Sequence, residues 1–206
     1  MSMRIAINMK TIACCIPCNW DHVPMQFFSS WMKVMIYAQD RYNLLLLISR
    51  TSTVGAMRQE GVKQALEGGA DYILHMDIDE IYPPDTPERL MKHIDSGLEV
   101  VGGLYTSRVN DVYSAFVFTE DPFDVRLAKI KPNTGLQKVD SMGFGGTMTS
   151  ISVYDKLEEP WFEGVEGHGE DVAFCKRCKD SGVQVWCDTD LHYGHLTLQA
   201  RYPQLT

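Results

Sequence analysis

The stretch Asp71-Tyr72-Ile73-Leu74-His75-Met76-Asp77-Ile78-Asp79 says most about the fold. Its first six residues are typical of a short apolar strand, and its last three place two carboxylates directly after that strand. Residues two apart in an extended chain point the same way, so Asp77 and Asp79 face one site while Ile78 faces away. In open α/β sheets, ligands bind beyond the carboxyl ends of the strands. The pair therefore predicts a Mg²⁺ or Mn²⁺ site that in turn binds a diphosphate, against the simpler interpretation of a solvated turn.

Strand-like and helix-like stretches alternate around this motif. We expect strands over 3–8, 42–49, 71–76 and 99–105, and helices over 24–39, 54–66 and 86–97. The run 42–49 is continuously apolar, as in a strand buried on both faces of a parallel sheet. Such alternation predicts an α/β fold with a mostly parallel twisted sheet and helices on both faces.

The second half of the chain is less regular. We expect a strand over 113–119, loop and edge structure over 121–140, and a glycine-rich turn over 143–146. A helix over 171–181 and a last strand over 183–187 follow. There is no internal repeat or linker, so the sequence predicts one domain over 1–206. Its halves are expected to be a nucleotide-binding half, 1–105, and an acceptor and metal half, 106–206.

The composition narrows the class of protein. A chain of 206 residues that is 45% hydrophobic and 22% charged is typical of a globular domain. A net charge of −8 argues against a protein that coats nucleic acid with a basic surface. The most apolar run, 44–48, is far shorter than the ~20 residues of a spanning helix, and the amino terminus lacks the pattern of a signal peptide. A cytoplasmic protein without a membrane span is the expectation.

The six cysteines allow two interpretations. Cys15 with Cys18, and Cys175 with Cys178, form two C-x-x-C pairs, which together can make a structural zinc site. The alternative is a set of reduced, half-buried thiols in a reducing compartment.

Two further patterns carry chemistry. Gly167-His168-Gly169-Glu170-Asp171 opens a helix, where Asp171 or Glu170 can act as a general base that takes a proton from a hydroxyl. Simple stabilisation of a helix start by acidic residues is the plainer interpretation. His192 and His195 follow the last expected strand, and a histidine near a carboxylate cluster can complete a mixed nitrogen and oxygen metal site.

The order of these pieces resembles the GT-A glycosyltransferases, particularly the short inverting family-2-type enzymes of bacteria and their viruses. The resemblance covers nearly the whole chain and rests on these stretches: 69–80 (GADYILHMDIDE), 101–105 (VGGLY), 143–147 (GFGGT), 160–162 (PWF), 169–175 (GEDVAFC) and 194–196 (GHL).

The resemblance implies a role for several residues. Asp79 and His195 look like metal ligands, and Asp77 contacts either the ribose or the metal, with Ile78 between the two carboxylates in the donor site. Asp171 looks like the catalytic base.

Further residues are implied on the donor and acceptor sides. Glu170 positions the acceptor, and Arg58 resembles the family arginine on the donor side. The nucleoside base is expected near Asn8 and Lys10, after the first strand. The backbone of Gly145 and Gly146 is expected to approach the donor sugar, because glycine has no side chain in the way. An exposed pair of aromatic residues, 161–162, could stack on an acceptor or could instead belong to the core.

The implied activity is metal-dependent transfer of a sugar from a nucleotide-sugar donor, a UDP-sugar first, to an acceptor hydroxyl with inversion. The implied cofactor is Mn²⁺ or Mg²⁺, and the acceptor is a glycan, a small molecule, a protein or a modified nucleic acid. Three alternatives stay open: a retaining GT-A enzyme, a nucleotidyltransferase, and a zinc-stabilised binding module. The sequence does not specify the oligomeric state.

Overall fold

The computed structural model describes residues 9–107, 112–117, 130–165 and 167–197. The strands are β1 (Thr11–Pro17), β2 (Asn43–Ser49), β3 (Tyr72–His75), β4 (Glu80–Ile81), β5 (Val100–Leu104), β6 (Ala115–Phe116), β7 (Leu136–Val139), β8 (Ser141–Met142), β9 (Thr147–Ser150), β10 (Val185–His192) and β11 (Gly194–His195). The helices are α1 (Met25–Ala38), α2 (Val54–Glu67), α3 (Thr86–Asp95), α4 (Ser152–Lys156) and α5 (Glu170–Asp180).

The main sheet has seven strands in the order β2-β1-β3-β9-β5-β10-β7. β2, β1 and β3 pair in parallel, as do β5 and β10, whereas β9 runs antiparallel to both β3 and β5. β7 closes the far edge as an antiparallel partner of β10. Five of the seven strands therefore point the same way, and the sheet is mixed with a largely parallel core.

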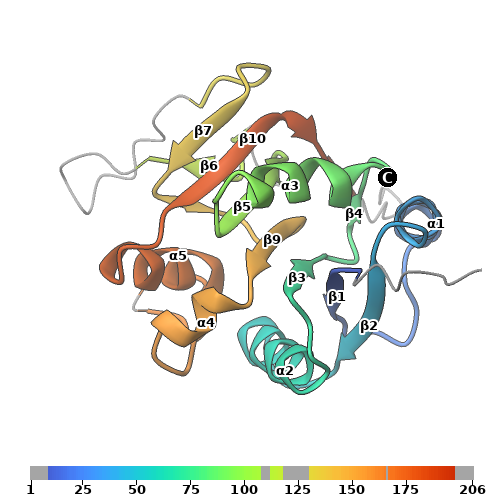
Figure 1. Ribbon diagram of the computed structural model, residues 1–206, viewed down its shortest axis with the longest axis horizontal. Coiled ribbons are helices and arrows are strands. Elements are labelled where there is room, and N and C mark those ends of the chain that lie inside the picture. Colours follow the sequence, from blue (N-terminus) through green and yellow to red (C-terminus); the bar gives the residue numbers. More distant parts are fainter. Residues whose placement is uncertain (1–8, 108–111, 118–129, 166, 198–206) are drawn as a thin grey trace, which may run out of the picture.

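Helices cover both faces of this sheet (Figure 1). On one face, side chains of α2, α4 and α5 form a core cluster with alternate residues of the strands, including Val62, Tyr154 and Phe174. On the other face, α1 and α3 contribute Phe27, Val34 and Leu90 to a second cluster. The alternation of strand side chains between two covered faces confirms the expected α/β fold.

The helices lie close to where the sequence predicts them. The hydroxyl of Thr53 accepts a hydrogen bond from the backbone N–H of Ala56 at 3.1 Å and caps the start of α2, and Gly69 follows the helix at a φ of 67°. Pro87 lies in the first turn of α3, where its missing N–H has no helical partner to lose. Capping and helix-breaking residues close to each terminus thus determine where α2 begins and ends and where α3 begins.

The expected strand 3–8 lies outside the described residues, and the first strand that the structure describes is β1, Thr11–Pro17. Its middle residues Ile12, Ala13, Cys14 and Cys15 are all buried between the two helix layers. Cys14 and Cys15 therefore lie in an interior strand of the sheet that is covered on both faces.

The sheet differs from expectation at two other strands. β2 is an edge strand with an exposed side, not a strand buried on both faces, since Leu46 and Ile48 are 45% and 53% exposed. No strand is expected after the glycine-rich turn 143–146, yet β9 follows it and lies in the middle of the sheet. The expected strand 113–119 is reduced to β6, its residues 118–119 lie outside the described residues, and the expected edge structure in 121–140 contains β7.

Trp161 and Phe162 belong to the core, as the plainer of the two expectations had it. They are 4% and 2% exposed, and Phe162 stacks on Phe174 with ring centroids 4.8 Å apart. In the described part of the chain, none of the helices has the length and apolar character needed to cross a bilayer.

Candidate active site

A buried arginine joins two of the acidic motifs. Arg58, on α2, is 3% exposed, and its Nη2 donates to both carboxylate oxygens of Asp77, at 2.9 and 3.1 Å. Its Nε donates to Oε1 of Glu170, at the start of α5, at 3.3 Å. Burial opposes the charge of Arg58, but the two carboxylates more than offset this and raise its pKa. The guanidinium therefore stays charged and fixes the positions of Asp77 and Glu170.

Asp79 and His195 come together from opposite ends of the chain. β4 and β11 pair antiparallel, with Glu80 opposite His195, and the backbone N–H of Leu196 donates to the carbonyl of Asp79 at 2.7 Å. As a result, Nε2 of His195 lies 3.8 Å from Oδ2 of Asp79. Both side chains are mostly covered, at 12% and 15% exposed. This small sheet builds the candidate metal pair.

The ring of His195 is oriented by a backbone carbonyl. Its Nδ1 lies 2.7 Å from the oxygen of Thr106, which can only accept, so Nδ1 carries the proton of the neutral ring. The lone pair then resides on Nε2, the nitrogen that faces Asp79. Metal-binding histidines show the same arrangement, in which a second partner fixes the tautomer and the ring direction. Two ligands that each lie about 2.2 Å from an ion are at most ~4.4 Å apart, so the 3.8 Å separation fits a shared ion.

Asp171 lies next to Glu170 in the first turn of α5 and is close enough to Asp77 for that charge to act on it. Its Oδ1 accepts a hydrogen bond from the backbone N–H of Val172 at 2.7 Å. Burial raises the pKa of Asp171, and the charge of Glu170 raises it further. A carboxylate with a raised pKa is a better proton acceptor, so the position supports the role of a general base.

Glu80 lies beneath the glycine-rich turn. It is 1% exposed, and burial followed by the charge of Asp77 raises its pKa well above the ordinary value. Among the described residues, its Oε2 has no hydrogen-bond partner. A side chain on Gly145 would meet this carboxyl, since a Cβ there would lie 2.1 Å from Oε1. The absence of a side chain at Gly145 thus makes room for Glu80.

The neighbouring glycines have similar packing roles. A Cβ on Gly146, which has a φ of 81°, would lie 2.1 Å from the ring of Tyr193. A Cβ on Gly143 would lie 1.9 Å from the hydroxyl of Tyr105. Gly145 and Gly146 are buried, so the structure explains them by close packing within the protein, which is a different reason from the expected approach to a donor sugar.

One pocket of about 410 Å³ brings together part of the predicted site, whereas Gly145, Gly146, Asp171 and His195 are not among the residues that line it. Arg58, Asp77, Ile78, Asp79 and Glu170 line it. Sequence reasoning missed the rest of its lining, which comes from the ends of β1 and β2 and the start of α2: Pro17, Asn19, Trp20, Ser52, Thr53, Val54 and Met57. The correct position of β1 is the signal that would have found them, because the loop after a strand's carboxyl end borders the site.

Lys10 does not lie where it was expected, in the donor site. It precedes β1, and its ammonium group pairs with Asp95 at the end of α3. This is the amino end of the parallel strands, whereas Asp77 follows the carboxyl end of β3. Lys10 therefore lies at the amino ends of the parallel strands, whereas the pocket lies at their carboxyl ends. Asn8, the other residue expected to contact the base, lies outside the described residues.

His192 does not join the metal pair. Its Nε2 lies 2.8 Å from the carbonyl oxygen of Thr189, and its side chain is exposed.

The cysteines do not form a cluster with metal-site geometry. All six are buried and reduced, and Cys15 contributes to one core cluster while Cys18 contributes to the other. Nowhere in the described residues do three His, Cys, Asp or Glu side chains converge as a complete metal-ligand set. A four-thiolate zinc site is thus absent from that part of the chain. A cation at Asp79 and His195 would take its other ligands from the substrate or from water, as Mg²⁺ commonly does.

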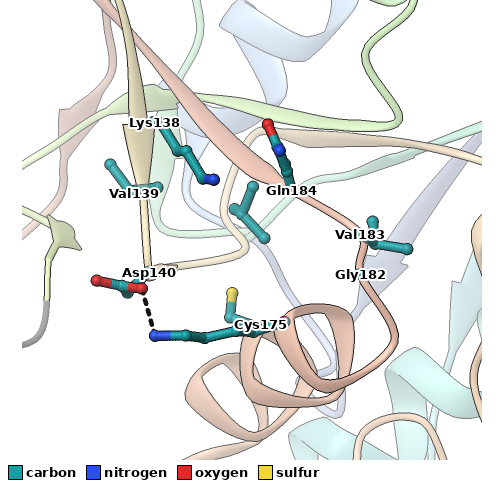
Figure 2. A pocket seen from close by; sticks show the side chains of 9 residues that line it. Lys138, Val139, Asp140, Cys175, Gly182, Val183 and Gln184 are labelled. Carbon is teal, nitrogen blue, oxygen red and sulfur yellow. Dashed lines mark hydrogen bonds and ion pairs between the residues drawn. The ribbon is translucent and has the colours of Figure 1, made fainter.

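A second pocket, of about 210 Å³, lies between β7, α5 and the start of β10 (Figure 2). It contains the ion pair between Lys179 and Asp140, at 2.8 Å, and the thiol of Cys175. Burial raises the pKa of Cys175 to about 12, so this thiol is not a nucleophile at neutral pH. The pocket holds none of the predicted site residues.

Comparison with known proteins finds similarity in structure and none in sequence. No protein-family model and no curated protein matches the sequence. The crystal structure of A197 from STIV is similar to this chain, with a TM-score of 0.61 and 16% identity. The match covers 96% of this chain and 100% of that chain. At this level of identity, the similarity shows a shared fold.

Proposed function

We propose that this chain is a metal-dependent glycosyltransferase of the GT-A type. It transfers a sugar from a nucleotide-sugar donor, a UDP-sugar first, to an acceptor hydroxyl with inversion at the anomeric carbon. The observation that carries the proposal is the pair formed by Asp79 and His195, with Nε2 directed at the carboxylate by the carbonyl of Thr106. The shared fold with A197 from STIV supports the architecture and says nothing of the chemistry.

The residues present fit a divalent cation. One imidazole nitrogen and one carboxylate suit Mn²⁺ or Mg²⁺ better than a soft metal, and the pair leaves positions open for phosphate oxygens. A cation held there supplies Lewis-acid stabilisation of the negative charge on the departing nucleoside diphosphate.

The protein's own residues perform the rest of the reaction. Asp171 takes the proton of the acceptor hydroxyl while the oxygen of that hydroxyl bonds to the anomeric carbon. The bond from that carbon to the diphosphate oxygen breaks from the opposite side, so the configuration inverts. Arg58 holds Asp77 and Glu170 at the donor side of the pocket throughout.

A thermal-shift screen tests the proposal. Purified protein is measured with UDP-, GDP-, ADP- and CMP-linked sugars, each with and without Mn²⁺. We expect a rise in Tm with one nucleoside, and only when the metal is present, because a ligand that binds the folded state alone stabilises it.

Matched variants locate the site. Asp79→Ala and His195→Ala should lose the metal-dependent rise, whereas His192→Ala should keep it, since His192 is exposed and lies away from the pair. A full metal-dependent rise in Asp79→Ala would show that the ligand is assigned wrongly. The absence of any shift in folded wild-type protein would argue against the donor site altogether.

A further inference from the structure

The residue that follows β5 contacts the candidate metal ligand His195. Tyr105 comes directly after Leu104, the last residue of β5, and its ring meets the imidazole of His195 nearly at a right angle. The two ring centroids are 5.3 Å apart, and the interplanar angle is 84°. Edge-to-face contacts between aromatic rings favour one relative orientation over others. The contact therefore limits how the imidazole can turn.

The next residue supplies the carbonyl that binds the same imidazole. The backbone oxygen of Thr106 lies 2.7 Å from Nδ1 of His195. Two consecutive residues thus touch the ligand, Tyr105 with its ring and Thr106 with its backbone. If the imidazole rotated by half a turn, Nδ1 would leave this carbonyl and Nε2 would turn away from Asp79. The ring of Tyr105 lies against the imidazole and opposes that rotation.

The backbone that carries Tyr105 is fixed by the segment opposite it. The N–H of Tyr105 donates to the hydroxyl of Ser114 at 3.2 Å, and the N–H of Ser114 donates to the carbonyl of Tyr105 at 2.8 Å. Thr106 and Tyr113 form an antiparallel bridge beside them. Because both peptide groups of Tyr105 are bonded, its side chain projects from a well-defined position.

The far end of Tyr105 lies at the glycine-rich turn. A Cβ on Gly143 would lie 1.9 Å from the hydroxyl oxygen, so the turn can approach the phenol only because this position has no side chain. Burial raises the pKa of Tyr105 well above its ordinary value, and the charges of Glu80 and Asp77 raise it further. The phenol therefore stays protonated, with its hydroxyl at the turn and its ring against His195.

We propose that Tyr105 is a positioning residue for His195, whose ring holds the imidazole with Nε2 toward Asp79. The proposal rests on the metal site of the proposed function, and it assigns the role to the ring and not to the hydroxyl, because the rings are what touch. Tyr105 also packs against the core cluster that includes residues of α1 and α3. Positioning must therefore be measured separately from stability.

The affinity for Mn²⁺ alone tests the proposal without any measurement of activity. Electron paramagnetic resonance reports free Mn²⁺ while the metal is titrated into purified protein. Tyr105→Leu should weaken Mn²⁺ binding about three- to tenfold, the range to which the energy of one edge-to-face contact corresponds. Tyr105→Phe keeps the ring and should bind Mn²⁺ as the wild type does.

Tyr72→Leu is the matched control. Tyr72 lies at the amino end of β3, and it is partly buried against the same core cluster as Tyr105. Asp77 and Asp79 follow the other end of that strand, so the ring of Tyr72 is remote from the metal pair. Both leucine variants should lose stability in urea unfolding, but Tyr72→Leu should keep the wild-type affinity for Mn²⁺.

A further variant moves the ring without removing it. If Tyr105→Leu does not fold, Gly143→Ala takes its place, because the new Cβ meets the hydroxyl oxygen and forces the phenol to shift. This variant should also weaken Mn²⁺ binding. Adding Tyr105→Phe should restore part of the affinity, since the atom that the Cβ meets is then gone.

The tautomer of His195 in the metal-free protein separates this proposal from the proposed function. Nitrogen-15 NMR should show the Nδ1–H form in the wild type and in Tyr105→Phe, and a mixture of both tautomers in Tyr105→Leu. A wild type that binds no Mn²⁺ would overturn the metal site, and the NMR result would still decide whether Tyr105 orients His195.

Two results would overturn the proposal itself. One is a folded Tyr105→Leu variant, or Gly143→Ala in its place, with the Mn²⁺ affinity and the His195 tautomer of the wild type. The other is an equal loss of Mn²⁺ affinity in Tyr72→Leu, which would show that the ring of Tyr105 acts only through the stability of the core.

Discussion

At the scale of single residues, the two carboxylates of the D-x-D motif have different partners. Asp77 is bound by Arg58, and Asp79 lies by His195. The motif itself, its place after a strand, and the late histidine were all legible in the sequence. The different partners of Asp77 and Asp79 could not be predicted from the sequence. They depend on Arg58, a buried cation that approaches from α2, and no spacing rule reveals that contact.

The buried arginine gives a stability prediction. Arg58→Met should lower the free energy of unfolding by about 2–3 kcal/mol. This is below the usual cost of breaking a buried pair, because Asp77 and Glu170 are about a quarter exposed and can be resolvated. Arg58→Lys should recover only part of the loss, since an ammonium group cannot donate in the same forked geometry. Urea denaturation measures both.

An exposed ion pair provides the control. Arg50 donates to Asp21 at 2.7 Å, but their side chains are 54% and 92% exposed. Arg50→Met should therefore change the free energy of unfolding by less than about 1 kcal/mol. Equal effects of Arg58→Met and Arg50→Met would contradict the idea that Arg58 organises the pocket.

At the scale of elements, the sequence predicted the long helices and several strands, and it missed β1 and the shortest strands. α1, α2, α3, α5, β3 and β5 have apolar periodicity, caps and breakers that act within one segment. β4 and β11 have two residues each and exist only because they pair with each other. β9 is likewise a strand only because β3 and β5 lie on both sides of it, so no local pattern marks it.

The glycine-rich turn before β9 gives a prediction at this scale. Gly145→Ala should destabilise the protein by about 1–3 kcal/mol, because its Cβ would overlap the buried carboxyl of Glu80 and force that side chain to move. Glu80→Ala removes the group that the new Cβ meets. In the double variant, the loss should be smaller than the sum of the two single losses, which a double-mutant cycle of urea melts measures. Additive losses would mean that the new Cβ does not act through the carboxyl of Glu80.

At the scale of the whole molecule, the cysteines tie stability to pH. Burial raises the pKa of Cys14, Cys175 and Cys187 to about 12, and it raises the pKa of Cys15 and Cys178 as well. Above pH ~8.5 the unfolded chain releases these protons while the folded chain keeps them, so the folded state binds more protons and stability falls as pH rises. Composition revealed six thiols, but only the packed fold shows that none reaches solvent.

This linkage gives a prediction for the molecule as a whole. In reducing buffer, each of the five thiols should cost about 1 kcal/mol for each pH unit above ~8.5. The total at pH 9.5 is on the order of 5 kcal/mol, comparable to the whole stability of many domains. Urea melts at pH 7.5 and 9.5 measure the loss, and Cys187→Ala should lose about 1 kcal/mol less than the wild type over that interval. Equal stability at both pH values would show that the thiols ionise within the folded protein.

The position of β9 has a consequence for synthesis on the ribosome. β3 and β5 leave the ribosome well before β9, yet they are joined in the sheet only through it. A nascent chain that has just produced β5 therefore holds one group of three strands of the main sheet, β2-β1-β3, and the separate strand β5, whose neighbours in that sheet are not yet made. The sheet becomes continuous only after the glycine-rich turn and β9 have emerged, so folding must wait for the later part of translation, and the exposed edges are the surfaces that a nascent-chain chaperone would protect meanwhile.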